Sequence, residues 1–182
     1  TGMRNLCLAG GVALNCVGNG LIMKEKIFRH MFVQPAAGDA GGALGAALLA
    51  YHRLLDGPRV PRARDAMKGG LLGPVCRRGD ILEALQRGGH RYRELPDAEL
   101  IDELSRRLAA GEVIGLVRGR MEFGPRALGG RSIIADARSP KMQSVMNLKI
   151  KFRESFRPFA PSVLREHVAD WFELDRDSPY ML

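Results

Sequence analysis

The sequence predicts a mixed α/β (α+β) fold. Short apolar segments that suit strands alternate along the chain with longer segments of helical periodicity. The segment from Asp97 to Gly111 is the clearest of these helices, because its aliphatic residues fall on a single face. Strands and helices are mixed in order and no internal repeat interrupts them, which excludes a helical bundle and a repeat array. A chain of 182 residues suits one domain or two small ones.

Two strand–helix pairs are expected in residues 1–55. Residues 5–9 suit an apolar strand, and Gly10-Gly11 then open a helical stretch to about Ile27. Residues 31–34 suit a second strand, before a helix over 41–55 that is rich in small residues. A strand–glycine–helix arrangement directs free backbone amides toward a phosphate. The same glycines also suit a tight turn, and Asp39 also suits an N-cap of the second helix.

Residues 56–78 separate this part from the rest. They contain three prolines and lack periodicity, so we expect a linker there. The elements expected beyond it are a short helix opening with capping-box spacing at 80–83, strands over 91–95, 113–117 and 133–135, and helices over 97–111, from 139–140 and over 164–172.

Composition indicates a globular protein of the cytoplasm. The hydrophobic content of 46% excludes a disordered chain. Three cysteines without a CxxC pair favour reduced, buried thiols. The sequence has no secretory signal pattern and no apolar run of about eighteen residues, so no membrane span is expected.

The net charge of +8 is concentrated in one region. Between residues 118 and 165 there are eleven lysines and arginines against three acids. Such a surplus suits nucleic acid or an anionic small molecule. We favour an anionic-substrate pocket, because RNA-binding modules interleave exposed aromatic residues with their cations. In this region Phe123, Phe152, Phe156 and Phe159 sit where they could equally belong to a core.

Residues 122–132 form the most informative segment. Their glycines and proline cannot continue a long regular element after the apolar strand over 113–117. A loop of this kind can bring backbone amides and two arginines, Arg126 and Arg131, close to an anion, and Arg120 stands just before it. The alternative is a solvated surface loop.

A second basic segment follows at residues 148–157, where cations and mostly apolar residues alternate. A period of two predicts a strand that carries its cations on one face, and Pro158 ends it. The cations are Lys149, Lys151, Arg153 and Arg157. Like charges on one sheet face destabilise it, so we expect a polyphosphate or a phosphate with a nucleotide there, the alternative being a wet outer face.

These segments carry a resemblance to a known family. The strings GRMEFGPRALGGRSIIADAR and NLKIKFRESFRPFAPSVL resemble the signature of O-carbamoyltransferases of the nodulation-protein and antibiotic-tailoring type. Residues 5–15 and 35–47 resemble the nucleotide-binding domain of the same family. The similarity covers nearly the whole chain and is weakest over 56–92. Gly130 and Ala137 depart from the residues usual in the family, which affects loop shape but removes no charge.

The resemblance implies a division of the chain and of the chemistry. Residues 1–55 would be the C-terminal portion of an actin-like, Kae1-like domain, 56–78 a linker, and 79–182 an incomplete YrdC-like domain. The YrdC-like part would join carbamoyl phosphate to ATP, with Mg²⁺, to give carbamoyl-adenylate. The Kae1-like part would transfer the carbamoyl group to a hydroxyl of a small-molecule acceptor. Members of the family are several times this length, so we expect the chain to be a piece of a larger enzyme.

The site residues follow from the resemblance and the charges. Lys151 and Arg157 are expected to bind the phosphate or carbamoyl group, and Arg126 and Arg131 to hold the other phosphates or orient the mixed anhydride. Arg120, Lys149 and Arg153 complete the expected site for carbamoyl phosphate and ATP. No side chain suits a covalent nucleophile, so catalysis would come from positioning and electrostatics.

The resemblance also implies a nucleotide and metal site in the first part. Gly10, Gly11 and Asn15 would bind the nucleotide, and Asp39 would be a ligand of a divalent metal, iron in the family. In the family, two histidines that precede this part of the chain complete the metal site. None of the four histidines present forms an HxxxH or HExxH pair, so we expect no complete metal site within this chain.

Two other classes remain open. One is a tRNA-modifying enzyme of the threonylcarbamoyl-adenylate type, whose members usually lack the EFGPRALGGRS string. The other is a non-catalytic basic RNA-binding module, which would bind RNA with strong salt dependence.

Overall fold

The computed structural model describes residues 2–61, 65–174 and 176–182. The described residues form two small sheets of two strands each, together with several helices, so the α+β class is confirmed. Residues 62–64 of the expected linker lie outside the described part. The chain divides into two compact units. The first comprises Thr1–Pro74, Arg120–Leu128 and Ser178–Leu182, and the second Val75–Gly119 and Gly129–Asp177.

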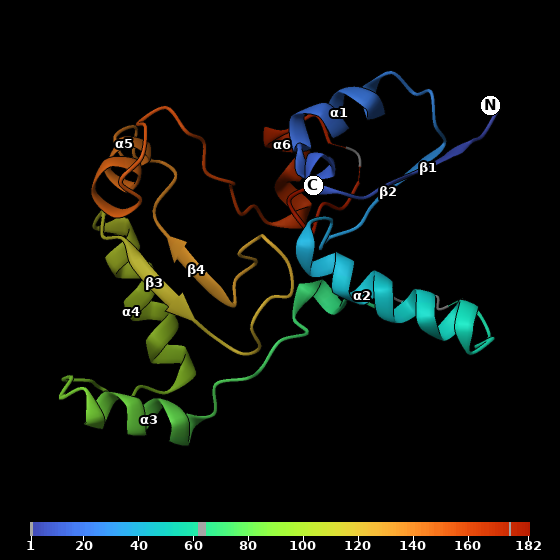
Figure 1. The fold of residues 1–182 in the computed structure, drawn as a ribbon. Helices are drawn as coiled ribbons and strands as arrows, with labels where there is room; N and C mark the ends of the chain where they lie inside the picture. Colours follow the sequence, from blue (N-terminus) through green and yellow to red (C-terminus); the bar gives the residue numbers. More distant parts are fainter. Residues whose placement is uncertain (1, 62–64, 175) are drawn as a thin grey trace. The chain divides into compact units, whose positions relative to one another are not determined.

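The first unit contains the two predicted strand–helix pairs. Strand β1 (Asn5–Leu8) runs parallel to β2 (His30–Val33), with Asn5 opposite His30 and Leu8 opposite Val33, and Figure 1 shows them side by side. A 3-10 turn (Gly11–Leu14) and helix α1 (Cys16–Lys24) connect them. Both strand predictions are confirmed, and the helical stretch begins with the 3-10 turn.

Helix α2 (Asp39–Leu49) leads directly into a π-helical segment (Ala50–Leu54), which confirms the helix expected over 41–55. None of the residues of α2 is buried. Among the described residues of the unit, the buried apolar residues are few and mostly alanines, and this limits the stability that the core can supply. They are Ala13, Ala36, Ala37 and Met67.

Gly41 allows the start of α2 to lie against the preceding loop. A Cβ atom at this position would overlap the carbonyl oxygen of Ala36, whereas a Cβ at Gly42, one residue later in the same helix, would meet nothing within 4 Å. We expect Gly41→Ala to lower the free energy of unfolding by about 1–3 kcal/mol, as overpacking does. The matched control Gly42→Ala should be neutral or stabilising, because Ala suits a helix interior better than Gly. Thermal denaturation followed by circular dichroism compares the two, and equal melting temperatures would contradict the expectation.

The last residues of the chain belong to the first unit. The Tyr180 hydroxyl donates to the Asp65 carboxylate and accepts a hydrogen bond of 3.0 Å from the Gly69 amide. The hydrogen bond from Tyr180 holds the pKa of Asp65 below its usual value. A 3-10 turn over Lys68–Gly70 completes this part.

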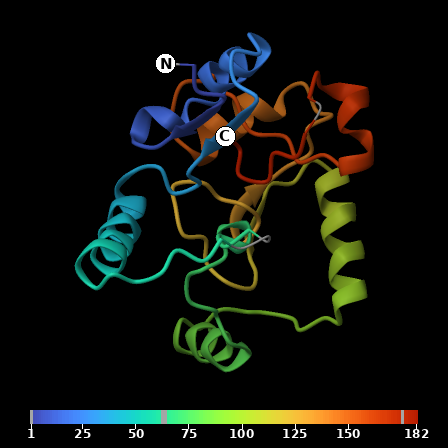
Figure 2. The ribbon, with the colours of Figure 1, turned by 90° about the vertical axis from the view of Figure 1, so that its right-hand side faces the viewer.

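The second unit is built around an antiparallel strand pair. Strand β3 (Ile114–Val117) pairs with β4 (Arg131–Ile134), with Val117 opposite Arg131, so the strands expected over 113–117 and 133–135 are confirmed. Helix α4 (Asp97–Ala109) confirms the predicted amphipathic helix and is seen along its length in Figure 2. Helix α3 (Arg78–Arg87) confirms the short helix but begins two residues before the predicted capping box at 80–83. Arg77 is its N-cap, and Asp80, in the first turn, accepts from the Arg77 amide at 3.1 Å.

The remaining helices are short. Helix α5 (Met142–Val145) follows the expected start at Ser139-Pro140 and continues into a π-helical segment (Met146–Ile150). A 3-10 turn (Arg165–His167) and α6 (Val168–Trp171) confirm the helical prediction for 164–172. Among the described residues, no helix combines the length and the apolar character needed to cross a bilayer. Cys7, Cys16 and Cys76 are unpaired as expected, but they are exposed rather than buried.

Two predicted strands are absent from segments that the structure describes in full. Residues 91–95 form no strand. Ion pairs hold this segment to the two neighbouring helices instead, through Glu94 to Arg78 of α3 at 2.7 Å and Arg93 to Glu103 of α4 at 3.3 Å. The strand prediction was therefore wrong: these ion pairs hold an irregular segment that has no partner strand among the described residues.

Residues 148–157 also form no strand. They comprise the end of the π-helical segment and an irregular loop. Phe152 has φ +49°, in the left-handed region, which a strand cannot accommodate. The predicted row of cations on one sheet face is therefore wrong, and the cations lie on a loop.

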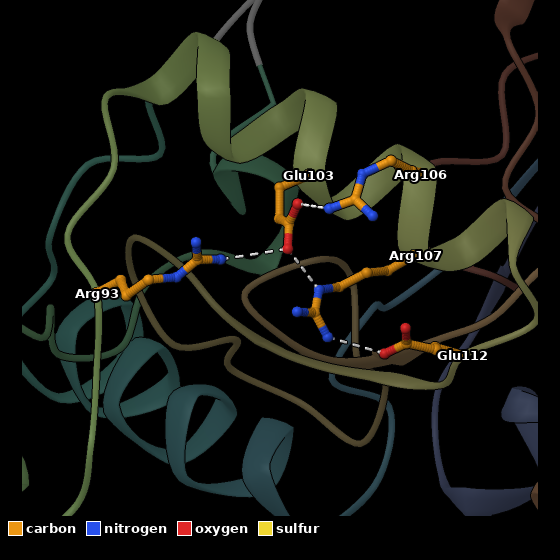
Figure 3. A network of polar contacts seen from close by, with 5 residues as sticks. All are labelled: Arg93, Glu103, Arg106, Arg107 and Glu112. Atoms are coloured by element: carbon orange, nitrogen blue, oxygen red, sulfur yellow. Dashed lines mark hydrogen bonds and ion pairs between the residues drawn. The ribbon is translucent and has the colours of Figure 1, made fainter.

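A network of ion pairs connects helix α4 to the segments before and after it, as Figure 3 shows. Glu103 is only 17% exposed in its side chain and accepts from Arg93, Arg106 and Arg107. Arg107 also pairs with Glu112, beyond the end of the helix, at 3.0 Å. Hydrogen bonds from Arg107 and Arg106 hold the pKa of Glu103 below its usual value. The network links the 91–95 segment and the turn after α4 to the helix itself.

Candidate functional site

The loop predicted over residues 122–132, which we call the glycine–arginine loop, is divided between the two units, and its first half belongs to the first unit. Met121 and the Gly73–Pro74 segment exchange two backbone hydrogen bonds of 2.9 Å, and the Phe123 amide donates to the Gly70 carbonyl at 2.6 Å. Arg120 donates from Nη1 to the Gly73 carbonyl at 2.7 Å. Hydrogen bonds thus connect residues 120–123 to residues 70–74, and the Arg120 side chain makes one of them.

Arg126 lies against the segment that follows β1. Its Nη2 donates to the Leu14 carbonyl at 2.7 Å, and its Nε is buried with no hydrogen-bond partner among the described residues. The Glu122 carboxylate accepts from the Leu128 amide at 2.8 Å and closes the loop. Gly124 has φ +131°, and a Cβ there would crowd the Pro35 carbonyl at 3.3 Å. The structure therefore places Arg126 with the predicted nucleotide-binding residues of the first unit.

Those predicted residues have structural partners of their own. Gly10 has φ +96°, and its amide donates to the Ala37 carbonyl at 2.8 Å. Asn15 caps α1, accepting from the Gly18 amide at 3.0 Å. Gly11 opens the 3-10 turn with no atom near the position of a Cβ. The three residues do lie in one connected segment after β1, as the sequence predicts.

Asp39 is the first residue of α2 and is exposed. Gly38 occupies the N-cap position, so the alternative interpretation of Asp39 as the cap is wrong. The Asp39 carboxylate lies in the first turn of α2, where the helix dipole favours a negative charge. Within the described residues, no three His, Cys, Asp or Glu side chains are placed to hold a metal ion together.

The second half of the loop belongs to the second unit. Arg131, the first residue of β4, donates from Nη1 to the Gly130 carbonyl at 2.7 Å and to the Arg118 carbonyl at 3.2 Å. Its Nη2 approaches the Cys76 sulfur at 3.3 Å. Arg126 and Arg131 are five residues apart in the sequence but belong to different units.

Just beyond the end of β4, Asp136 and Arg138 form a close ion pair. Arg138 donates to the Asp136 carboxylate from Nη2 at 2.7 Å and from its backbone amide at 2.9 Å. These hydrogen bonds lower the pKa of Asp136 to about 2. The carboxylate therefore stays charged throughout the neutral and mildly acidic range.

The second basic segment is a loop organised by Asn147. This side chain is fully buried, and its Nδ2 donates to the Ser155 carbonyl at 3.0 Å and the Arg157 carbonyl at 2.8 Å. Its Oδ1 accepts from Arg153 Nε at 2.6 Å. Gln143 of α5 donates to the Phe156 and Arg157 carbonyls at 3.1 and 3.2 Å. We call residues 149–157 the cationic loop.

The cations of this loop differ in their surroundings. Arg153 is half-buried and lies over the Phe159 ring, 4.8 Å from its centroid. Arg157 pairs with Glu154 at 2.8 Å, and a hydrogen bond from the backbone amide of Glu154 together with Arg157 lowers the pKa of Glu154. Lys149 and Lys151 are exposed. The structure thus brings four of the predicted cations onto one short loop.

The aromatic residues of the loop are not core residues. Phe152 and Phe156 are 84% and 76% exposed, whereas Phe123 and Phe159 are half-buried. Two exposed rings beside several cations can stack on a nucleic-acid base or on the base of a nucleotide. The sequence argument that these aromatics suit a core is wrong for Phe152 and Phe156.

Sequence reasoning missed Asn147 and Gln143. Asn147 is a polar residue in the otherwise apolar run Val145-Met146-Asn147-Leu148, and such a residue in a buried position needs partners. This interruption of the apolar run is the feature of the sequence that could have indicated a structural role for Asn147. A separate shallow hollow of about 290 Å³ on α3 contains none of the predicted site residues. It is lined by Arg78, Ile81, Leu82, Leu85, Tyr92, Arg93 and Glu94.

Comparison with known proteins gives two family matches. Residues 1–48 match the family model described as carbamoyltransferase N-terminus, and residues 105–182 match that described as carbamoyltransferase C-terminus. The chain is 57% identical over its whole length to the uncharacterized protein sll1178 of Synechocystis, of which it covers 30%.

Named relatives include nodulation proteins. The chain is 46% identical to Nodulation protein NolO of Bradyrhizobium diazoefficiens and 38% identical to Nodulation protein U of Rhizobium tropici. In each case all of this chain is aligned, but it covers only 33% and 29% of the relative. The chain therefore spans about a third of the length of the curated relatives that it matches.

Proposed function

The chain belongs to the carbamoyltransferase family, and on that premise we propose that it is part of an O-carbamoyltransferase. The whole enzyme would make carbamoyl-adenylate from carbamoyl phosphate, water and ATP, with release of phosphate and pyrophosphate. It would then pass the carbamoyl group to a hydroxyl of a small-molecule acceptor, with release of AMP. The observation that carries the proposal is the cationic loop, which presents Lys151 and Arg157 beside a fully buried organising side chain.

The first step brings two highly charged anions together. Cations are needed to offset their repulsion and the charge that develops as the new bond to phosphorus forms. Lys151 is exposed and free to meet a phosphate oxygen as a point charge, and Arg157 offers a planar fork. Lys149 and Arg131 are the further candidates of the second unit, where this step would take place in a YrdC-like domain.

The transfer step is proposed for the first unit, as part of a Kae1-like domain. Gly10, Gly11 and Asn15 would face the nucleotide there, and Arg126 joins them because it contacts Leu14. The exposed Asp39 carboxylate suits a divalent metal as one oxygen ligand, and the other ligands would come from outside this chain. The bound metal would supply Lewis acidity at the acceptor hydroxyl. Mg²⁺ would arrive with ATP.

A test of the proposal is carbamoyl-phosphate-dependent release of pyrophosphate from ATP by the full-length protein. Lys151→Ala should weaken carbamoyl phosphate binding about 10- to 100-fold, since a charge-assisted hydrogen bond is worth about 1.5–3 kcal/mol. Lys141→Ala removes the same charge from an exposed position before α5 and should leave binding unchanged. Calorimetry with carbamoyl phosphate gives the affinities, and equal affinities for the two variants would remove Lys151 from the site.

A nucleic-acid module is the second candidate, because Phe152 and Phe156 are exposed beside cations. It predicts salt-dependent binding of single-stranded RNA that falls when Phe152 is replaced by Ala. RNA binding without saturable binding of carbamoyl phosphate would favour this candidate over the transferase.

A further inference from the structure

We propose that Asn147 is a positioning residue that holds the cationic loop in its ligand-binding shape, and that Arg153 is a clamp of this loop and not a ligand of the anion. The inference deepens the proposed function and rests on it. It concerns contacts within the second unit alone.

The cationic loop cannot hold its shape through regular secondary structure. Phe152 is in the left-handed region, where a non-glycine residue needs support from its surroundings. Lys151, Phe152 and Phe156 are exposed and contribute little packing. The position of the Lys151 and Arg157 backbone must therefore come from hydrogen bonds.

Asn147 takes part in more of those bonds than Gln143, which makes two. Both protons of the Asn147 side-chain amide are donated to loop carbonyls, those of Ser155 and Arg157. Its backbone carbonyl accepts from the backbone amide of Arg153 at 3.0 Å. The side chain is 0% exposed, so each lost partner would leave a buried polar group unsatisfied. One residue thus fixes the loop at three of its positions.

The backbone at Asn147 is adapted to this task. It lies in the π-helical segment Met146–Ile150, where the Lys151 amide donates to the Met146 carbonyl. Short π-helical segments insert one residue into a turn and frequently mark functional sites. Here the amide of Asn147 is buried while the neighbouring Leu148 is exposed, and such reversals of the usual burial are typical of functional positions.

Arg153 has a different role from its neighbours. Its Nε donates to the Asn147 side-chain oxygen, and its guanidinium lies over the Phe159 ring. Its charge is therefore directed toward Asn147 and Phe159. Lys151 and Arg157 flank this clamp along the chain. The anion would then be held by Lys151 and Arg157, with Arg153 fixing the spacing between them.

The test uses the full-length enzyme and the KM for carbamoyl phosphate in pyrophosphate release. Asn147→Asp keeps the shape of the side chain but replaces the NH2 group, which makes both donations, by a carboxylate oxygen that faces the Ser155 and Arg157 carbonyls. We expect this KM to rise about tenfold or more, because two buried hydrogen bonds are lost. Asn19→Asp is the matched control, since Asn19 is also a buried asparagine and its amide donates to the Ala13 carbonyl at 2.8 Å in the first unit. It should lower the melting temperature without changing this KM.

A second comparison separates a clamp from a ligand. If Arg153 acts through Asn147, the double variant Asn147→Ala with Arg153→Ala should lose no more affinity than Asn147→Ala alone, whereas additive losses would make Arg153 an independent ligand. Where Asn147→Asp does not fold, Gln143→Ala replaces it, because it removes only the exposed bonds to the Phe156 and Arg157 carbonyls. A KM raised about threefold or more at an unchanged melting temperature supports positioning, and an unchanged KM overturns it.

The two levels of the proposal fail differently. An unchanged KM in Asn147→Asp together with a raised KM in Lys151→Ala overturns the positioning role and leaves the proposed function intact. Unchanged kinetics in Lys151→Ala would instead remove the loop from the reaction.

Discussion

Replacing Asp39 by Ala in the full-length protein should abolish carbamoyl transfer while leaving carbamoyl-adenylate formation intact. Asp39 is an exposed carboxylate of the first unit, whereas Lys151 and Arg157 belong to the second. If the metal and the acceptor are bound by the first unit, loss of one ligand removes the metal and the transfer step together. Metal content of the purified protein, pyrophosphate release and product formation are the three measurements.

Asp97→Ala is the matched control for this variant. Asp97 is the first residue of α4, as Asp39 is of α2, and both carboxylates stand in the first turn of their helices. The control loses the same favourable interaction with a helix dipole but no metal ligand. An Asp39→Ala protein that keeps its metal and its transfer rate would show that Asp39 acts only on the helix.

The spacing of apolar residues predicted those helices and strands whose conformation depends on neighbouring residues in the sequence. The strands at β1 and β2 and the amphipathic helix α4 were found because apolar spacing reports which face is buried. The strand expected over 148–157 had the same kind of pattern and was wrong. Its conformation is set by the side chains of Asn147 and Gln143, which bond to carbonyls eight or more residues away. No count of alternating residues contains that information.

The cations of the candidate site were named from charge and spacing, but their grouping was not. Arg126 and Arg131 stand close together in the sequence, but residues 120–128 belong to the first unit, where Met121 pairs with Gly73–Pro74 and Phe123 with Gly70. That pairing joins residues about fifty positions apart. Arg126 lies beside Leu14 in the first unit, whereas Arg131 and the cationic loop belong to the second unit.

The 182-residue chain expressed by itself should not transfer a carbamoyl group to any acceptor. The described residues of its first unit form a sheet of only two parallel strands, whereas parallel sheets in proteins are covered on both faces. Helix α2 buries none of its residues, and Leu49 and Leu54, at its end and in the π-helical segment that follows, are 62% and 79% exposed. A unit of this size buries a small fraction of its surface and has little stability of its own.

The same reasoning predicts where the chain is weakest. Hydrogen exchange should be fast in β1, β2 and α2, unless self-association covers their apolar side chains, and slower in α4, which is fastened by the network around Glu103. Exchange followed by mass spectrometry at two protein concentrations separates these cases, because protection through self-association increases with concentration. Metal-dependent carbamoylation of an alcohol by this chain would contradict the expectation, since it would mean that two strands and their helices suffice for a working transfer site.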